Sequence, residues 1–389
     1  MKALERIMIC LAAFVLILSS VCINFTHGNQ FLQDKEGDAG RAPYTRETSS
    51  EKKTPTDMQG REERKPISLS LHINTDDTSV TDLSGYNFQA LIFLRQQIDS
   101  QLIKLAMSVN SSQDGFVYVS NGSEVRINQY EGSNPIVIVP SEIDGLPVTQ
   151  FHQNAFKGNI IITSVTLPEG TTEIPQEFFK DCTSLKNVYL PNSVTRIGRS
   201  AFLHDTKLDS IILHEGIIEI EDAAFQRCEH LKGVAILPTS LMNFGGFVFS
   251  RCDNMSGAII QSNITVGDYS FSNHSMKFIY VKDGCNVSFE KTPFDDGLEV
   301  AILPETVTNI GDNVFDECNK LRIVCPAGSY AEMYAKQHFI MCDTEHYSQF
   351  VQDYDDSLVT DISGYSFQDL VNLREKIDSQ LVKTALNTN

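Results

Sequence analysis

Apolar residues recur with a fixed period through the middle of the chain. Phenylalanine returns at steps of 21 to 24 residues, at Phe156, Phe179, Phe202, Phe225, Phe249, Phe271, Phe294 and Phe315. Before each ring, apolar and polar residues alternate over a short stretch, as at Leu185, Val188 and Leu190. A second apolar pair follows, such as Val194 and Ile197. Alternation predicts short strands, and a period in the twenties predicts a solenoid whose units bury their apolar faces only against one another.

The unit resembles the BspA-type bacterial leucine-rich repeat, whose usual form is close to LxxIxIPxxVTxIGxxAFxxC. Proline stops the alternating stretch at Pro168, Pro191, Pro238 and Pro304. The resemblance covers roughly Asp114 to Ile340, and the ends of this range look like the N-terminal β-cap and short closing helix of the family. It implies a repeat solenoid of mainly short β-strands over residues 114–342, with flanking α-helical segments.

Some units depart from this pattern. His214 replaces a proline, the unit around Phe271 is short, and Asp295 and Asp296 follow Phe294. We therefore expect irregular turns between about residues 260 and 298.

A duplicated segment brackets the predicted solenoid. Residues 75–110 and 354–389 align without gaps at an offset of 279, with 21 identities in 36 positions. Each copy predicts a capped amphipathic helix, with Asn87 as one cap and Ser366 with Asp369 as a capping box. One such helix cannot bury its apolar stripe alone. The pair is interpreted either as end-caps that shield the solenoid or as a docking module used twice.

The N-terminus has the composition of an export signal. A short basic region precedes an uncharged stretch from Ile7 to Val21, so residues 1–28 are predicted to be a signal peptide or a signal anchor. Cys22 follows Val21, where a lipoprotein signal would place a small residue. Residues 29–74 are polar and are predicted to be a disordered linker. A secreted or cell-surface protein, attached to membrane only through its N-terminal segment, is expected.

The net charge of −19 excludes some partners. Basic residues do not cluster outside the linker, so binding to nucleic acid or to acidic lipid is not expected.

Four cysteines share one position of the repeat. Cys182, Cys228, Cys252 and Cys318 each lie three residues after a repeat phenylalanine, so we expect buried, unpaired thiols rather than disulfides or metal ligands. Cys285, Cys325 and Cys342 lie outside this phase, and the repeat does not account for them.

No active-site motif stands out. The nine histidines are scattered, and HExxH, CxxC, GxSxG and a glycine-rich phosphate loop are all missing from the sequence. We therefore expect no enzyme, no cofactor and no metal site.

The outward positions of the strands become apolar toward the C-terminal half. This apolar patch comprises Ile259, Phe278, Tyr280, Val300, Ile302 and Ile323. Exposed apolar patches usually have a partner. Three interpretations compete: irregular turns rotate these residues into the core, the 354–389 helix covers them, or an external ligand binds there.

The resemblance implies an exported surface protein that mediates adhesion or recognition of a protein or glycan ligand, host-derived or bacterial. The alternative is a structural or envelope-assembly protein in which the solenoid spaces two helical docking segments. The sequence does not identify the ligand, the oligomeric state or the fate of residues 7–25.

Overall fold

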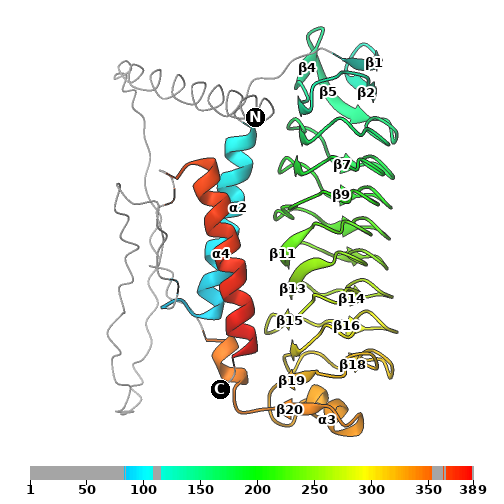
Figure 1. The fold of residues 1–389 in the computed structure, drawn as a ribbon. Coiled ribbons are helices and arrows are strands. Elements are labelled where there is room, and N and C mark those ends of the chain that lie inside the picture. Colours follow the sequence, from blue (N-terminus) through cyan, green and yellow to red (C-terminus); the bar gives the residue numbers. More distant parts are fainter. Residues whose placement is uncertain (1–82, 84, 108–114, 353–361, 363–364, 388–389) are drawn as a thin grey trace, which may run out of the picture. The chain divides into compact units, whose positions relative to one another are not determined.

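The computed structural model describes residues 83, 85–107, 115–352, 362 and 365–387. The predicted signal segment 1–28 and linker 29–74 lie outside the described residues. Within the described residues, short turns stack into a solenoid. One long helix precedes the solenoid in the sequence, and another long helix follows it (Figure 1).

Each central turn of the solenoid contributes strands to two parallel ladders. The first ladder contains the residues of the LxxLxL stretch, and the second contains those of the following apolar pair. The first comprises β3 (Ile136–Ile138), β6 (Ser164–Thr166), β8 (Asn187–Tyr189), β11 (Lys232–Leu237), β13 (Asn254–Ile260), β15 (Phe278–Val281), β17 (Val300–Ile302), β19 (Arg322–Val324) and β20 (Met341–Asp343). The second comprises β7 (Glu173–Ile174), β9 (Arg196–Ile197), β10 (Glu219–Ile220), β12 (Asn243–Phe244), β14 (Thr265–Val266), β16 (Ser288–Phe289) and β18 (Asn309–Ile310).

The first ladder is interrupted once. Strands β3, β6 and β8 form one sheet, and β11 to β20 form another. In the intervening turn, only the isolated bridge between Asn187 and Ser210 is present. The next strand, β11, also shifts register between Gly233 and Val234.

Different elements cap the two ends of the solenoid. At the start, β1 (Phe116–Ser120), β2 (Val125–Tyr130), β5 (Leu146–Phe151) and β4 (Glu142–Ile143) form a mixed sheet. At the other end, α3 (Tyr330–Gln337) begins at Ser329, whose hydroxyl accepts a hydrogen bond from the Glu332 N–H. Strand β20 then adds to β19, and a 3-10 helix, η1 (Tyr347–Phe350), follows. Helix α3 packs on the end of the solenoid core, whereas Tyr347 and Phe350 of η1 pack with the long helices.

The repeat phenylalanines form one continuous column inside the solenoid, as predicted. Consecutive ring centroids from Phe156 to Phe315 lie 5.0 to 6.1 Å apart, and their planes are inclined by 6° to 24°. All eight rings are at most 4% exposed. Each ring therefore packs on the previous and the next turn, which links the turns through dispersion and apolar burial.

The two copies of the duplicated segment form the long helices α2 (Phe88–Met107) and α4 (Phe367–Leu386). The predicted caps are confirmed. Asn87 accepts a hydrogen bond from the Ala90 N–H at 2.8 Å, and Ser366 and Asp369 form the capping box. The helices pack side by side and antiparallel (Figure 1). Within the described residues, neither they nor α3 is both long and apolar enough to cross a membrane.

The expected irregularity between residues 260 and 298 is wrong for the first ladder, whereas the second ladder does break between β12 and β14, at the start of this region. Strands β13, β15 and β17 pair in continuous parallel register there. The phenylalanine column also continues through the short unit, because Phe271 stacks between Phe249 and Phe294. The first ladder is instead disturbed earlier, at the interrupted turn before β11.

The four in-phase cysteines are free and buried. Their thiols lie beside backbone carbonyls of earlier turns, for example Cys182 Sγ at 3.0 Å from Phe156 O and Cys228 Sγ at 3.1 Å from Phe202 O. Burial raises the pKa of each thiol, that of Cys318 to about 12. These cysteines thus fill a fixed place in the turn as protonated thiols.

We predict that Phe202→Ala lowers the free energy of unfolding by about 3–5 kcal/mol, because it removes one ring from the closed column. Phe339→Ala is the matched control, since Phe339 is 98% exposed. Chemical denaturation followed by circular dichroism measures both. Equal effects from the two substitutions would contradict the buried column.

A carboxyl group takes the place of a thiol in one turn. Asp205 lies at the cysteine position after Phe202, is buried, and accepts a hydrogen bond from the Cys182 N–H at 2.8 Å. Burial raises the pKa of Asp205 well above its usual range. An unfolded chain releases this proton near pH 4, whereas the folded chain retains it to higher pH. Stability from this group is therefore greatest in acid and falls as pH rises toward the folded pKa.

We predict that Asp205→Asn raises the melting temperature at neutral pH and that this gain shrinks toward pH 4. Asparagine keeps an oxygen for the Cys182 N–H and already occurs at the same phase as Asn159. Melting curves of wild type, Asp205→Asn and the exposed control Glu169→Gln at several pH values measure the effect. A gain that is independent of pH would contradict a buried, titrating Asp205.

Candidate functional site: the strand face under the helices

One outer face of the first ladder is apolar and lies under α2 and α4. We call it the covered face, and it consists of Ile212, Val234, Ile236, Ile259, Phe278, Tyr280, Val300, Ile302 and Val324. These residues form a second hydrophobic cluster with the helices, separate from the cluster inside the solenoid. Strand alternation explains the separation, because neighbouring residues such as Ile279 and Ala301 point into the solenoid core.

The predicted apolar patch is buried rather than exposed. Ile259, Phe278, Tyr280, Val300 and Ile302 belong to the covered face, and each is at most 3% exposed. They point away from the solenoid core, so the interpretation in which irregular turns rotate them into that core is wrong. The packing agrees with a helical cover, and α2 takes part in it together with α4.

Ile323 is placed differently. It belongs to the cluster inside the solenoid, and Val324 takes the outward position in register with Ile302. The predicted outward column is therefore one residue out of register at β19. In β11, Ile236 is in register with Ile259.

An aromatic cluster anchors the first turn of α2 to the covered face. The Phe88 ring lies 6.1 Å from that of Phe278, 5.0 Å from Tyr280 and 5.4 Å from Phe350 of η1, with edge-to-face geometry throughout. The Gln89 amide donates hydrogen bonds to the Tyr280 hydroxyl and to the Phe350 carbonyl, both at 2.7 Å. Burial raises the pKa of Tyr280 to about 12. The polar tip of this tyrosine is thus satisfied by the helix that covers it.

Two reciprocal ion pairs join the helices. Arg95 Nε lies 2.9 Å from Asp378 Oδ1, and Arg374 Nε lies 3.0 Å from Asp99 Oδ1. The two arginines are equivalent positions of the duplicated segment, and so are the two aspartates. Arg95 also pairs with Asp99 within α2. The antiparallel crossing therefore has approximate two-fold symmetry, in which each copy supplies the same charges to the other.

The ion pairs lie over the interrupted turn of the ladder. The Arg374 guanidinium donates a hydrogen bond to the Ile211 carbonyl at 3.2 Å, in the turn that lacks a full strand. The Asp378 carboxylate lies against Gly233, which has φ +85°, and a Cβ at that glycine would collide with the carboxylate. A cavity of about 20 Å³ between Arg95, Arg374 and β11 has room for one water molecule.

Three of the four charged residues, Arg95, Arg374 and Asp378, are buried, and Asp99 is partly buried. The side chains of Arg95 and Asp378 are 1% and 6% exposed. Burial acts to lower the pKa of Arg95, but attraction to Asp378 and Asp99 outweighs it and leaves that pKa raised. Removing any one of these charged side chains leaves the opposite charge of its partner buried without compensation.

Sequence reasoning missed this group of charges, although a signal was present. Arg and Asp recur four residues apart in both copies, as Arg95 with Asp99 and as Arg374 with Asp378. They lie next to the apolar stripe rather than opposite to it. Charges on the apolar side of a duplicated helix suggest that the two copies pair with each other.

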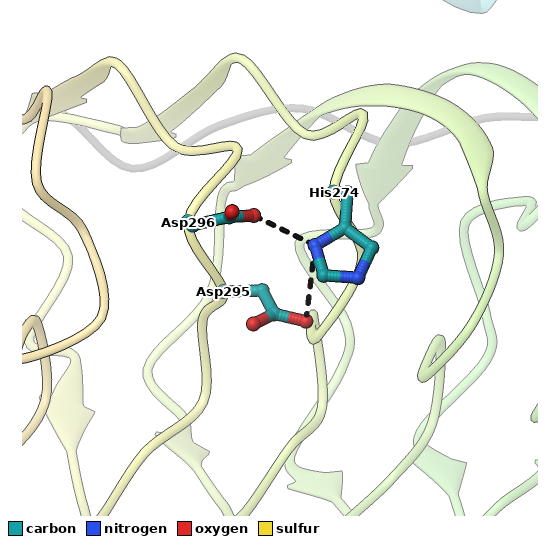
Figure 2. A group of neighbouring side chains, drawn as sticks. All are labelled: His274, Asp295 and Asp296. Carbon is teal, nitrogen blue, oxygen red and sulfur yellow. Dashed lines mark hydrogen bonds and ion pairs between the residues drawn. The ribbon is translucent and has the colours of Figure 1, made fainter.

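A second group of side chains joins two turns at the surface. His274 Nδ1 lies 2.6 Å from Asp296 Oδ1 and 3.7 Å from Asp295 Oδ2 (Figure 2). In the described part of the chain, this is the one group of three or more His, Cys, Asp or Glu whose donor atoms converge as metal ligands do. The main cause that raises the pKa of His274 is the hydrogen bond that its ring donates to the Asp296 carboxylate. His204 and Asp181 make a similar link at 2.9 Å. Ion pairing between turns therefore accounts for the geometry.

The parallel ladders, the phenylalanine column and the atypical ends define a leucine-rich-repeat solenoid. The family described as BspA type Leucine rich repeat region matches six copies, over residues 149–277 and 289–384. More than half of the sequence is matched, and the chain belongs to this family. Such repeat families are generally binding or scaffold proteins rather than enzymes.

Several solved structures are similar to this chain. A leucine rich repeat protein of T. pallidum is 22% identical, with a TM-score of 0.41, over 63% of this chain and 100% of that one. One from Bacteroides ovatus is 20% identical, with a TM-score of 0.43, over 63% and 70%. A leucine rich cell surface protein of Faecalibacterium prausnitzii is 25% identical, with a TM-score of 0.39, over 56% and 54%. No curated protein is similar enough to count as a match.

We predict that Arg95→Leu destabilises the helix cover by about 3–5 kcal/mol, because it leaves Asp378 buried without its partner. The double variant Arg95→Leu with Asp378→Leu recovers most of this loss, since both charges are gone. Denaturation of the single and double variants, with limited proteolysis of α2 and α4, measures both. A double variant as unstable as the sum of the two single variants would contradict the pairing.

Proposed function

We propose that this chain is an exported, cell-surface leucine-rich-repeat protein that recognises protein or glycan ligands and mediates adhesion. The covered face carries the proposal. It is a continuous apolar strip across neighbouring turns, and two amphipathic helices already occupy it. A surface that packs against helices with this spacing of apolar residues is suited to protein recognition.

Export rests on the sequence of the first residues. The basic start and the uncharged stretch from Ile7 to Val21 have the pattern of a secretory signal. The net charge of −19 favours solubility and disfavours binding to acidic polymers.

The proposed ligand-contacting residues are Ile259, Phe278, Tyr280, Val300 and Ile302. In the described conformation they contact α2 and α4, so a ligand would have to displace one of the helices. The interface contains features suited to this exchange. Its anchor is a small aromatic cluster around Phe88, and its charged groups are satisfied within the helix pair rather than by the ladder alone.

The packing disfavours the structural alternative, in which the solenoid spaces two docking helices. The apolar stripes of both helices are buried, including Leu91 and Ile98 of α2 and Leu370 and Ile377 of α4. Because both helices bury their apolar faces against the solenoid and against each other, little apolar surface remains for binding an envelope partner. A cover over the ladder therefore fits their burial better.

We predict that deletion of residues 354–389 exposes part of the covered face and increases the binding of a hydrophobic fluorescent dye. The far-ultraviolet signal of the solenoid should persist, because its core cluster contains no residue of α4. Unchanged dye fluorescence in a folded deletion variant would show that α4 is not a cover.

The ligand itself can be sought with purified host matrix glycoproteins and with the envelope polymers of the source cell. We expect host glycoproteins to bind, and the deletion variant to bind them more tightly than the full chain. In the deletion variant, Phe278→Ser with Ile302→Ser should abolish the binding. Met242→Ser with Met341→Ser is the matched control, because both methionines are exposed. Binding of envelope polymers alone would favour the structural alternative.

A further inference from the structure

Two cysteines that the repeat does not explain meet at the C-terminal cap. Cys325 directly follows β19, and Cys342 lies in β20, the last strand of the ladder. Their sulfur atoms are 3.5 Å apart. The in-phase cysteines differ, because their sulfur atoms contact backbone carbonyls of earlier turns.

The backbone holds the two thiols in place. Strands β19 and β20 are parallel and in register, with Ile323 opposite Cys342, and the Cys325 N–H donates a hydrogen bond to the Asp343 carbonyl at 3.1 Å. A disulfide needs sulfur atoms about 2.05 Å apart, so the two sulfur atoms have to approach each other from 3.5 Å for the bond to form. Cys325 is fully buried and Cys342 is half-buried, so an oxidant in solution would reach Cys342 first.

We propose that Cys325 and Cys342 form a disulfide that closes the C-terminal cap. The compartment in which it forms rests on the proposed export, because disulfides persist in oxidising surroundings. The pairing itself rests on the geometry of the cap.

The reaction is a thiol–disulfide exchange with a small-molecule disulfide or an oxidised thiol oxidoreductase. The thiolate of Cys342 attacks the oxidant disulfide and releases one thiol, giving a mixed disulfide on Cys342. The thiolate of Cys325 then attacks the Cys342 sulfur and releases the second thiol. The two cysteines lose two protons and two electrons, and the oxidant becomes two thiols. Burial raises the pKa of both cysteines, so the exchange is slow near neutral pH and faster in mild alkali.

The disulfide would join the last two strands at the C-terminal end of the solenoid. The loop between the two cysteines contains α3, which covers the last turn, and β20 has one strand neighbour within its sheet. End units of a solenoid contact only one other unit and open first. A covalent link across β19 and β20 would therefore raise the stability of the C-terminal end in particular.

The test uses the full chain and a glutathione redox buffer. After oxidation, the protein is alkylated in denaturant without reduction and digested with trypsin. We expect one cross-linked product, joining peptide 323–336 to peptide 337–374. The melting temperature of the oxidised chain should exceed that of the reduced chain by about 5–10 °C. Cys285→Ser should keep both effects, and Cys342→Ala should lose both.

Two outcomes would overturn the proposal: alkylation of both Cys325 and Cys342 after full oxidation, or a cross-link between any other pair. Because oxidation is carried out on purified protein, these outcomes do not depend on where the protein resides. Alkylation of the same cysteines in material taken from its source would instead count against export, provided that the purified chain forms the link.

Discussion

Stacking between turns is the interaction on which the whole structure depends. No single turn of about 23 residues can enclose its own phenylalanine, and each ring is buried only because rings of the neighbouring turns lie about 5–6 Å away on either side. Backbone hydrogen bonds between the stacked turns set the spacing of the parallel strands. That spacing also sets the distance between the outward side chains that form the covered face. The solenoid core and the covered face therefore both follow from the repeat of about 23 residues in the sequence.

The helix pair follows a different rule. Neither helix can bury its apolar stripe alone, and the covered face provides the missing partner. The charges between the helices sit where the first ladder is interrupted, and Arg374 reaches the free carbonyl of Ile211 there. This hydrogen bond connects the interrupted turn of the ladder to the middle of the helix pair. The cover is more than an apolar layer, because its register along the solenoid is fixed by hydrogen bonds.

The sequence predicted those features that depend on local period. The phenylalanine column, the helix caps at Asn87 and Ser366, and the free in-phase cysteines could all be read from spacing. Features that depend on the meeting of distant segments could not. Ile323 was assigned to the wrong side because one residue of register reverses a strand face. The exposure of Phe278 could not be judged, because its cover comes from a segment about 190 residues away.

The reciprocal charges also restrict how the two copies of the duplicated segment can diverge. In an ordinary duplication, one copy is free to change while the other keeps the original role. Here Arg95 pairs with Asp378 as well as with Asp99 of its own copy, and Arg374 pairs with Asp99, so a substitution in one copy leaves a charge without its partner in the other copy. An exchange of Arg and Asp is tolerable only when both copies carry it. The contacts between the two copies thus constrain which residues these four positions can carry in both of them.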